Sequence, residues 1–201
     1  MAAQPEAERL VRPAAGRLDR DRSLLLVIDV QARLAPHVQG HEAVIGRSEA
    51  LLAAARRFHV PCLLTEHCAA QIGPVIARLR ERFDDGEIFA KTHFGAVDHP
   101  EFESLLRGHG RPQVVVTGME AHVCVLQTVL GLAACEYQVF VVGDAVGSRG
   151  ARATDRQFAL DRMRAAGCTV VGTETVLFEW TRAGDDAAFR DILALVKTLP
   201  D

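Results

Sequence analysis

Apolar residues occur along the chain in short runs that alternate with longer stretches of helical spacing. Runs of four to seven aliphatic residues are typical of strands that are buried on both faces of a sheet. The expected strands are Leu24–Val30, Val60–Thr65, Glu87–Ala90, Val114–Thr117, Val139–Val142 and Thr169–Val171. The expected helices are His41–His59, Pro74–Phe83, Pro100–Gly108, His122–Ala134, Arg152–Ala166, Thr175–Thr181 and Asp186–Leu199.

Strands separated by helices in this way imply β-α-β units with right-handed crossovers. The pattern therefore predicts an α/β fold, a three-layer αβα sandwich around a six-stranded parallel sheet. No internal repeat or linker interrupts residues 23–199, so residues 23–201 are assigned to one domain. Residues 1–22, rich in Ala and Arg, are expected to form a flexible or partly docked tail.

Composition excludes several classes of protein. Hydrophobic residues make up 49% of the chain and charged residues 24%, which is ordinary for a soluble globular protein. A net charge of −3 without any basic block argues against a nucleic-acid partner, and no apolar run is long enough for a membrane span. The 5 cysteines include no C-x-x-C pair and no apolar signal sequence precedes them, so we expect a cytoplasmic protein.

Asp29 lies at the end of the first expected strand, and Cys124 follows the fourth. In open α/β sheets, ligands bind beyond the carboxyl ends of the strands, where the strand order switches direction. If the strand order is 3-2-1-4-5-6, that crevice lies between strands 1 and 4. Asp29 ends strand 1, and Cys124 opens the helix that follows strand 4. The sequence after the first strand, DVQARLAP, has no glycine-rich phosphate loop, which argues against a nucleotide site.

Cys124 is the candidate nucleophile because the positive end of a helix dipole favours a thiolate. Lowering a thiol pKa by two units needs roughly 2.7 kcal/mol, whereas a helix end supplies about 0.3–2 kcal/mol. Lys91, which ends the third strand, is the candidate for the missing positive charge. That strand lies roughly 10 Å from the first, so the lysine stem must bridge the gap or the following loop must fold back. Asp29 is the candidate base.

Each residue also has an ordinary structural interpretation. A lone cysteine is often a core residue, a strand-end aspartate a turn cap and a lysine a surface charge. His122 lies two positions before Cys124, so their side chains diverge on a helix and a Cys–His dyad is less favoured. His67, Cys68 and His93 lack regular metal-ligand spacing, and we expect no metal. A redox-sensing thiol would need a resolving partner such as Cys68.

Four stretches, in this order, carry a resemblance: LLLVIDVQ, FAKTHFGA, VVVTGMEAHVCVLQT and VVGDAVGSR. Over about residues 23–180 the chain resembles the isochorismatase-like cysteine hydrolases, and within them the isochorismatase domain-containing group. The last two stretches together are fairly specific, whereas VIDVQ alone is weak. The resemblance implies the strand order 3-2-1-4-5-6 and a catalytic triad of Asp29, Lys91 and Cys124.

The resemblance also implies a cis peptide bond between Met119 and Glu120. That bond would direct the backbone N–H groups of Glu120 and Cys124 toward an oxyanion. Gln31, Phe94 and Met119 are expected to line the substrate pocket. A homo-oligomer is expected as well.

Two departures from the family narrow the expected chemistry. The stretch after the second strand, TEHCAAQIGP, lacks the Asp-x-His motif through which nicotinamidases bind a metal. Isochorismatases cleave a vinyl ether without a thiol, whereas this chain retains Cys124. We therefore expect cofactor-free hydrolysis of a small amide, ureido or related carbonyl compound through a thioester. A non-catalytic interaction protein and a vinyl-ether hydrolase are the alternatives.

Overall fold

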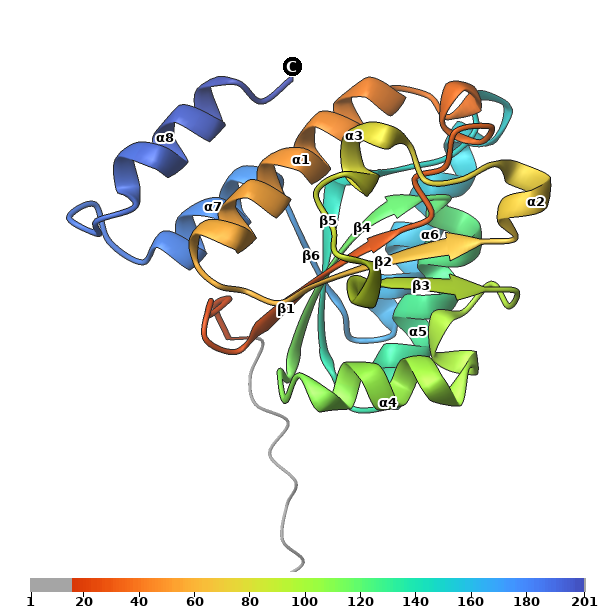
Figure 1. Cartoon of the computed structure of the whole chain (residues 1–201), viewed down its shortest axis with the longest axis horizontal. Coiled ribbons are helices and arrows are strands. Elements are labelled where there is room, and N and C mark those ends of the chain that lie inside the picture. Colours follow the sequence, from red (N-terminus) through yellow and green to blue (C-terminus); the bar gives the residue numbers. More distant parts are fainter. Residues whose placement is uncertain (1–15, 201) are drawn as a thin grey trace, which may run out of the picture.

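A six-stranded, entirely parallel sheet forms the centre of the computed structural model, which describes residues 16–200 (Figure 1). Its strand order is β3-β2-β1-β4-β5-β6, which confirms the predicted fold class and strand order. The strands are β1 Ser23–Ile28, β2 Cys62–His67, β3 Ile88–Lys91, β4 Gln113–Met119, β5 Gln138–Gly147 and β6 Thr169–Val171. β1 and β4 lie side by side at the switch in strand order, so the segments that carry Asp29 and Cys124 meet there.

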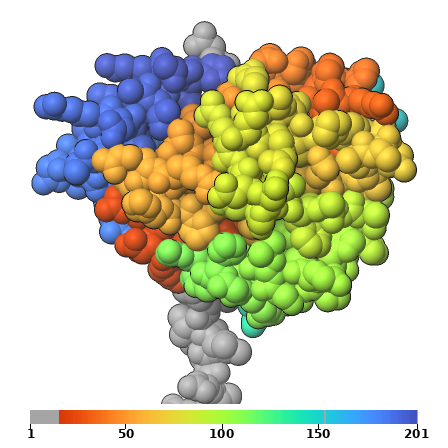
Figure 2. Space-filling view, in the orientation of Figure 1, coloured from red at the N-terminus to blue at the C-terminus, as the bar shows by residue number. Residues whose placement is uncertain are grey.

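Helices cover both faces of the sheet. They are α1 His41–Arg57, α2 Ala69–Ile72, α3 Ala77–Arg80, α4 Pro100–Gly108, α5 Leu126–Ala134, α6 Ala153–Ala165, α7 Thr173–Thr181 and α8 Phe189–Lys197. Figure 2 shows helices of both layers in one view, with α1 and α8 side by side above, the segment of α3 across the middle and α4 in green below. Within residues 16–200, no helix combines the length and apolar character needed to cross a bilayer.

Alternation along the strands supplies a hydrophobic core on each face. In β1, Leu25 and Val27 pack with residues of α1, α7 and α8, whereas Leu24, Leu26 and Ile28 pack with residues of α4, α5 and α6. All five side chains are fully buried. Because successive strand residues point to opposite faces, a strand covered on both sides is apolar throughout. This double coverage explains why the strands read as uninterrupted aliphatic runs.

The expected helix Pro74–Phe83 is wrong in its first half. The chain is extended there and pairs with the loop after β1: Ala32 N donates to Pro74 O, and Ile76 N donates to Val30 O. Only Ala77–Arg80 is helical. Pairing with a distant segment outweighed the local preference of proline for a helix start. β5 is likewise longer than expected, because Gly143 does not end it and its last residues pair with the end of β4.

The N-terminal segment that the structure describes is docked onto the domain. Leu18 is buried and its N–H donates to Glu179 Oε2. Arg20 forms a 2.8 Å ion pair with Asp186 and lies over the ring of Phe58. Residues 1–15 of the expected tail lie outside the described residues. The domain therefore includes residues before the expected boundary at residue 23.

Candidate active site

Asp29 lies at the carboxyl end of β1, immediately after its last residue. Its backbone φ is 49°, in the left-handed region that aspartate tolerates better than most residues. The Asp29 N–H still donates to Thr65 O on β2 at 3.2 Å. The chain therefore leaves the sheet at Asp29, beside the end of β2.

Lys91 and Asp29 form a buried ion pair. Lys91 Nζ lies 2.7 Å from Asp29 Oδ2, and neither side chain is exposed. The ammonium also donates to the carbonyl oxygens of His93 at 3.2 Å and Phe94 at 3.1 Å. Two of its three N–H groups therefore have carbonyl partners, and the ammonium faces Asp29 Oδ2 as an ion pair. The lysine stem spans the width of β2, and the loop after β3 also folds back over it.

The two oxygens of the Asp29 carboxylate have different surroundings. Oδ1 accepts a hydrogen bond from the Thr65 hydroxyl at 2.6 Å. Oδ2 faces the Lys91 ammonium but, among the described residues, accepts no hydrogen bond of good geometry. The Thr65 hydroxyl thus fixes the orientation of the carboxylate. Oδ2 keeps the capacity to accept a proton from a third group.

Cys124 lies in a π-helical turn, Ala121–Val125, labelled η4, and α5 begins only at Leu126. The expected position, in the first turn of an α-helix, is therefore corrected. The Glu120 carbonyl accepts hydrogen bonds from Val123 N and Val125 N, but not from Cys124 N, which lies between them in the sequence. A π-turn widens the backbone and is common at functional sites. The Cys124 side chain packs into the core with 6% of the residue exposed.

Burial, and after it the charge of Asp29, raise the pKa of the Cys124 thiol to about 12, while the charge of Lys91 opposes both. The raised pKa favours the neutral thiol at pH 7. This direction is opposite to the expected effect of Lys91 on the thiol: burial outweighs the Lys91 charge, and Asp29 pairs with that ammonium at 2.7 Å. Nucleophilic attack by Cys124 therefore requires a base that removes the thiol proton. Asp29 lies close enough for its charge to affect the pKa of this thiol.

The backbone before Cys124 has an unusual path. The peptide bond between Met119 and Glu120 is cis. Gly118, one residue earlier, has a φ of 124°, and a Cβ atom there would lie 2.0 Å from the carbonyl oxygen of Ile28. β4 therefore approaches β1 so closely at this point that only glycine fits.

The three expected pocket residues have different environments. The Gln31 side chain is buried and bonds to His67 N, His67 O and Gly73 O, so it links the loops after β1 and β2. Met119 is fully buried in the core. Phe94 is 48% exposed, with its ring 5.2 Å from that of His67. Phe94 thus lies at the surface beside Lys91, and a pocket role for all three stays a prediction.

Sequence reasoning missed several polar residues around Cys124. Thr65 was assigned to a strand without a role, yet it donates to Asp29. Glu120 was considered only for its backbone, yet its Oε1 accepts hydrogen bonds from the backbone N and Nε of Arg149. His122 Nδ1 lies 2.9 Å from Ser148 Oγ. The sequence feature that could have identified these residues is a polar residue within or beside an apolar stretch. Such a residue is buried and needs a hydrogen-bond partner.

The histidines near the site show no arrangement for a metal. Burial, with a smaller contribution from the Lys91 charge, lowers the pKa of His67. His93 Nδ1 lies 3.0 Å from His99 Nε2, so each ring nitrogen already has the other as a partner. Within residues 16–200, no three His, Cys, Asp or Glu side chains gather as a candidate metal site.

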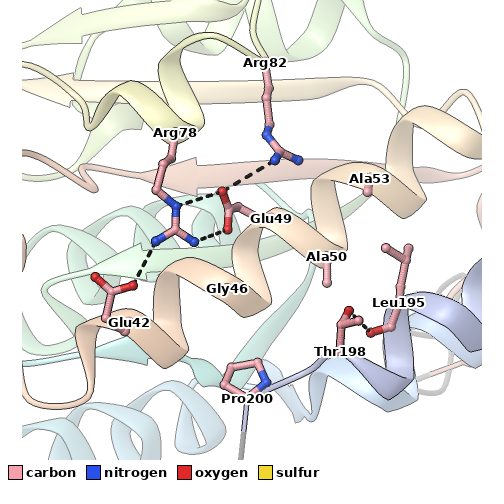
Figure 3. A pocket seen from close by; sticks show the side chains of 10 residues that line it. All are labelled: Glu42, Gly46, Glu49, Ala50, Ala53, Arg78, Arg82, Leu195, Thr198 and Pro200. Carbon is pink, nitrogen blue, oxygen red and sulfur yellow. Dashed lines mark hydrogen bonds and ion pairs between the residues drawn. The ribbon is translucent and has the colours of Figure 1, made fainter.

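A groove of about 410 Å³ lies away from these residues, between α1, α3 and α8 (Figure 3). Small residues of α1, including Gly46, Ala50 and Ala53, line it. Arg78 bridges Glu42 and Glu49 along its wall. The groove contains no thiol and follows a helix rather than the strand ends. Its chemistry therefore gives no reason to place the active site there.

Comparisons with known proteins place the chain in a family and agree with its fold. The family model described as "Isochorismatase domain" matches residues 23–175. Isochorismatase family protein 1A of Dictyostelium discoideum is 31% identical over 186 residues, covering 90% of this chain and 89% of that protein. The structure of MAR1 ribonuclease from Caenorhabditis elegans has a TM-score of 0.85 at 32% identity, covering 92% of this chain and 95% of that one.

Two structures of YcaC are also similar. YcaC from Pseudomonas aeruginosa, described with hexane-2,5-diol and covalent acrylamide, has a TM-score of 0.82 at 29% identity. The alignment covers 89% of this chain and 91% of that one. YcaC from Escherichia coli, described as an octameric hydrolase of unknown specificity, has a TM-score of 0.80 at 28% identity. That alignment covers 91% of this chain and 88% of the other.

Proposed function

The chain belongs to the isochorismatase family, and on that premise we propose that it is a cysteine hydrolase of a small amide, ureido or related carbonyl compound. One observation carries the proposal. A buried carboxylate, paired with an ammonium at 2.7 Å and oriented by a hydroxyl, interacts with a buried thiol that needs a base. Two buried charges are costly to maintain as scaffold alone, and such perturbed groups concentrate at functional sites.

Acylation starts from the neutral thiol. Asp29 Oδ2 takes the thiol proton of Cys124 as the sulfur attacks the substrate carbonyl carbon. The carbonyl π electrons move to oxygen, and the backbone N–H groups of Glu120 and Cys124 donate hydrogen bonds to that oxyanion. When the tetrahedral intermediate collapses, the C–N bond breaks and protonated Asp29 returns its proton to the leaving nitrogen. The product is a thioester at Cys124 and a free amine or ammonia.

Deacylation uses the same base. Asp29 accepts a proton from water, whose oxygen attacks the thioester carbonyl, and the C–S bond breaks to regenerate the thiol with the proton held by Asp29. Lys91 transfers no proton in this scheme, because its ammonium stays paired with Asp29 and donates to two backbone carbonyls. Its charge stabilises the Asp29 carboxylate before each proton transfer and the sulfur anion during the transfer.

The proposed site suits a small, uncharged carbonyl compound. Asp29 and Lys91 neutralise one another, so no unpaired charge beside Cys124 selects a charged substrate. Acrylamide, described as covalent for YcaC of P. aeruginosa, joins a nucleophile through its C=C bond and keeps its amide. It therefore supports a reactive nucleophile that admits small neutral compounds in that relative, and the amide substrate of this chain stays part of the proposal.

RNA is a second candidate substrate because MAR1 ribonuclease from C. elegans has a similar structure. Two features of this chain disfavour it. The net charge is −3, whereas proteins that bind nucleic acid neutralise phosphates with basic groups. Cys124 is also 94% buried, which suits a small molecule better than a polymer.

We further propose a homo-oligomer located in the cytoplasm. The octameric assembly described for YcaC of E. coli supports the first part. All five cysteines are free, as a reducing compartment would leave them, which supports the second. Light scattering on the purified full chain would measure the number of subunits, and a monomer at micromolar concentration would contradict the proposal.

The test is a panel of small amides, ureas and carbamates, together with a labelled RNA oligonucleotide, incubated with the wild type and with Cys124→Ser. Cys168→Ser, which alters another buried cysteine, is the matched control. We expect release of amine or ammonia by the wild type and control alone, and an acylated Cys124 peptide in rapidly quenched samples. Turnover by Cys124→Ser at the wild-type rate would exclude the thioester route. Cleavage of RNA alone would favour the second candidate.

A further inference from the structure

The turn that carries Cys124 is attached to the loop after β5 by two side chains. We call residues Glu120–Val125 the nucleophile turn and Ser148–Arg149 the clamp loop. Glu120 Oε1 accepts hydrogen bonds from Arg149 N at 3.1 Å and Arg149 Nε at 2.9 Å. His122 Nδ1 and Ser148 Oγ lie 2.9 Å apart. One residue before and one residue within the π-helical turn therefore bond to two consecutive residues of another segment.

The clamp loop is in turn fixed to the segment that follows Asp29. Gln39 N donates to Ser148 O at 3.0 Å. Val38 and Arg149 form an isolated antiparallel bridge. Since Val38 and Gln39 follow β1 through a short 3-10 helix, Ala35–His37, the clamp loop connects the segment after Asp29 with the turn that holds Cys124. This connection does not pass through Lys91.

Each side-chain link has one buried end, Glu120 in the first and Ser148 in the second. The Glu120 side chain is 8% exposed, whereas its partner Arg149 is 51% exposed. The residue Ser148 is 1% exposed. A buried ion pair is weak evidence for stability, because desolvation offsets much of its attraction, and a role in fixing one geometry is the better-supported reason for keeping it. Within residues 16–200, no side-chain hydrogen bond caps the start of the turn.

We propose that the clamp loop positions Cys124 against the Asp29–Lys91 pair, with His122 and Glu120 as the positioning residues. The inference rests on the proposed function, because the position of Cys124 affects a reaction only if Cys124 is the nucleophile. The contacts from which it is argued do not depend on that function. His122 also faces Asp155, whose Oδ2 lies 4.0 Å from Nε2, and Arg152 lies 3.9 Å from that carboxylate. His122 therefore joins the nucleophile turn to the start of α6 as well as to the clamp loop.

The test measures thiol alkylation by acrylamide at pH 8.5, resolved for each cysteine by peptide mass spectrometry. We expect His122→Ala and Ser148→Ala each to accelerate alkylation of Cys124 at least fivefold, because a loosened turn leaves the thiol less buried. Cys62 and Cys168, buried elsewhere in the core, should keep their wild-type rates. His122→Asn places a polar atom at the Nδ1 position and should return the rate to within twofold of wild type. Glu103→Ala, which removes a surface pair on α4, is the control.

Unchanged alkylation of Cys124 in folded His122→Ala and Ser148→Ala would overturn the proposal. Equal acceleration at Cys62 and Cys168 would overturn it too, since that result indicates global loosening. If His122→Ala does not fold, Ser148→Ala and Arg149→Ala decide by the same criteria. Alkylation requires no turnover, so a chain that hydrolyses no amide can still show the selective acceleration. That combination would reject the proposed function while supporting the clamp.

Discussion

The Lys91 ammonium lies 2.7 Å from Asp29 Oδ2, although β2 separates the two strands that carry these residues. Both side chains are completely buried, so each charge depends on the other for compensation. Removing one partner from such a pair is typically more damaging than replacing both, because the remaining charge stays desolvated. This relationship makes the pair the most sensitive point of the proposed site.

Lys91→Met should lower the free energy of unfolding by about 3–5 kcal/mol at pH 7, because Asp29 is left as an unpaired buried charge. Urea denaturation at pH 7 measures this loss. The double variant Lys91→Met, Asp29→Asn should recover most of the lost stability without regaining activity. A double variant that is as unstable as Lys91→Met alone would contradict the explanation.

Alkylation of Cys124 should follow a thiol pKa of about 12, raised first by burial and then by the Asp29 charge. The rate of reaction with iodoacetamide should therefore increase about tenfold per pH unit from pH 7 to 10, without levelling near the usual value of about 8.5. A plateau below pH 9 would indicate a resting thiolate instead. Peptide mass spectrometry on quenched samples gives the rate at each cysteine.

Asp29→Asn should separate thiol ionisation from catalysis. The substitution removes the negative charge that raises the pKa of Cys124 and leaves the Lys91 charge that lowers it. Alkylation of Cys124 at pH 8 should rise at least tenfold, while hydrolysis of any substrate from the panel falls at least 10²-fold, the usual contribution of a general base. Cys62 is the internal control, since burial raises its pKa to about 12 and Asp29 is not among its neighbours. Retained hydrolysis would remove Asp29 from its proposed role.

Gly118→Ala should abolish folding or cost more than about 4 kcal/mol. Its new Cβ would lie 2.0 Å from Ile28 O and 2.7 Å from Ile28 N, both backbone atoms of the central strand, and its φ of 124° disfavours any side chain. Gly108→Ala is the control, because a Cβ there meets nothing within 4 Å at the end of α4. That variant should be neutral or more stable by up to about 1 kcal/mol. Soluble expression and thermal unfolding distinguish the two.

Local patterns were sufficient to predict the sheet. The β-branched run at 114–117 and the aliphatic run at 24–28 are fully buried strands because helices cover both faces. Lys91 was identifiable because a charge at the end of an apolar strand needs a buried partner or solvent. These inferences required only the chemistry of neighbouring residues.

The remaining features depend on contacts between distant segments. Pro74 was expected to begin a helix, yet residues 74–76 pair with residues 30–32 across the carboxyl edge of the sheet. The pKa of Cys124 depends first on how deeply the thiol is buried and then on where Asp29 and Lys91 lie around it. Ser148 and Arg149 meet the nucleophile turn only after β5 extends to Gly147. No local sequence pattern encodes these distances.

Thr65→Val tests whether orientation of the Asp29 carboxylate matters for the reaction. Valine matches threonine in shape but cannot donate the 2.6 Å hydrogen bond to Asp29 Oδ1, so a buried carboxylate oxygen loses its partner. We expect a loss of about 1–3 kcal/mol in the free energy of unfolding and a fall of about tenfold in kcat, because a freely turning carboxylate is less often aligned with the thiol. Thr65→Ser keeps the hydroxyl and should retain most of the rate, although it leaves a small cavity in β2. If Thr65→Val lowers stability while kcat stays at the wild-type value, Thr65 supports the strand rather than the base, and the carboxylate must be held by Lys91 alone.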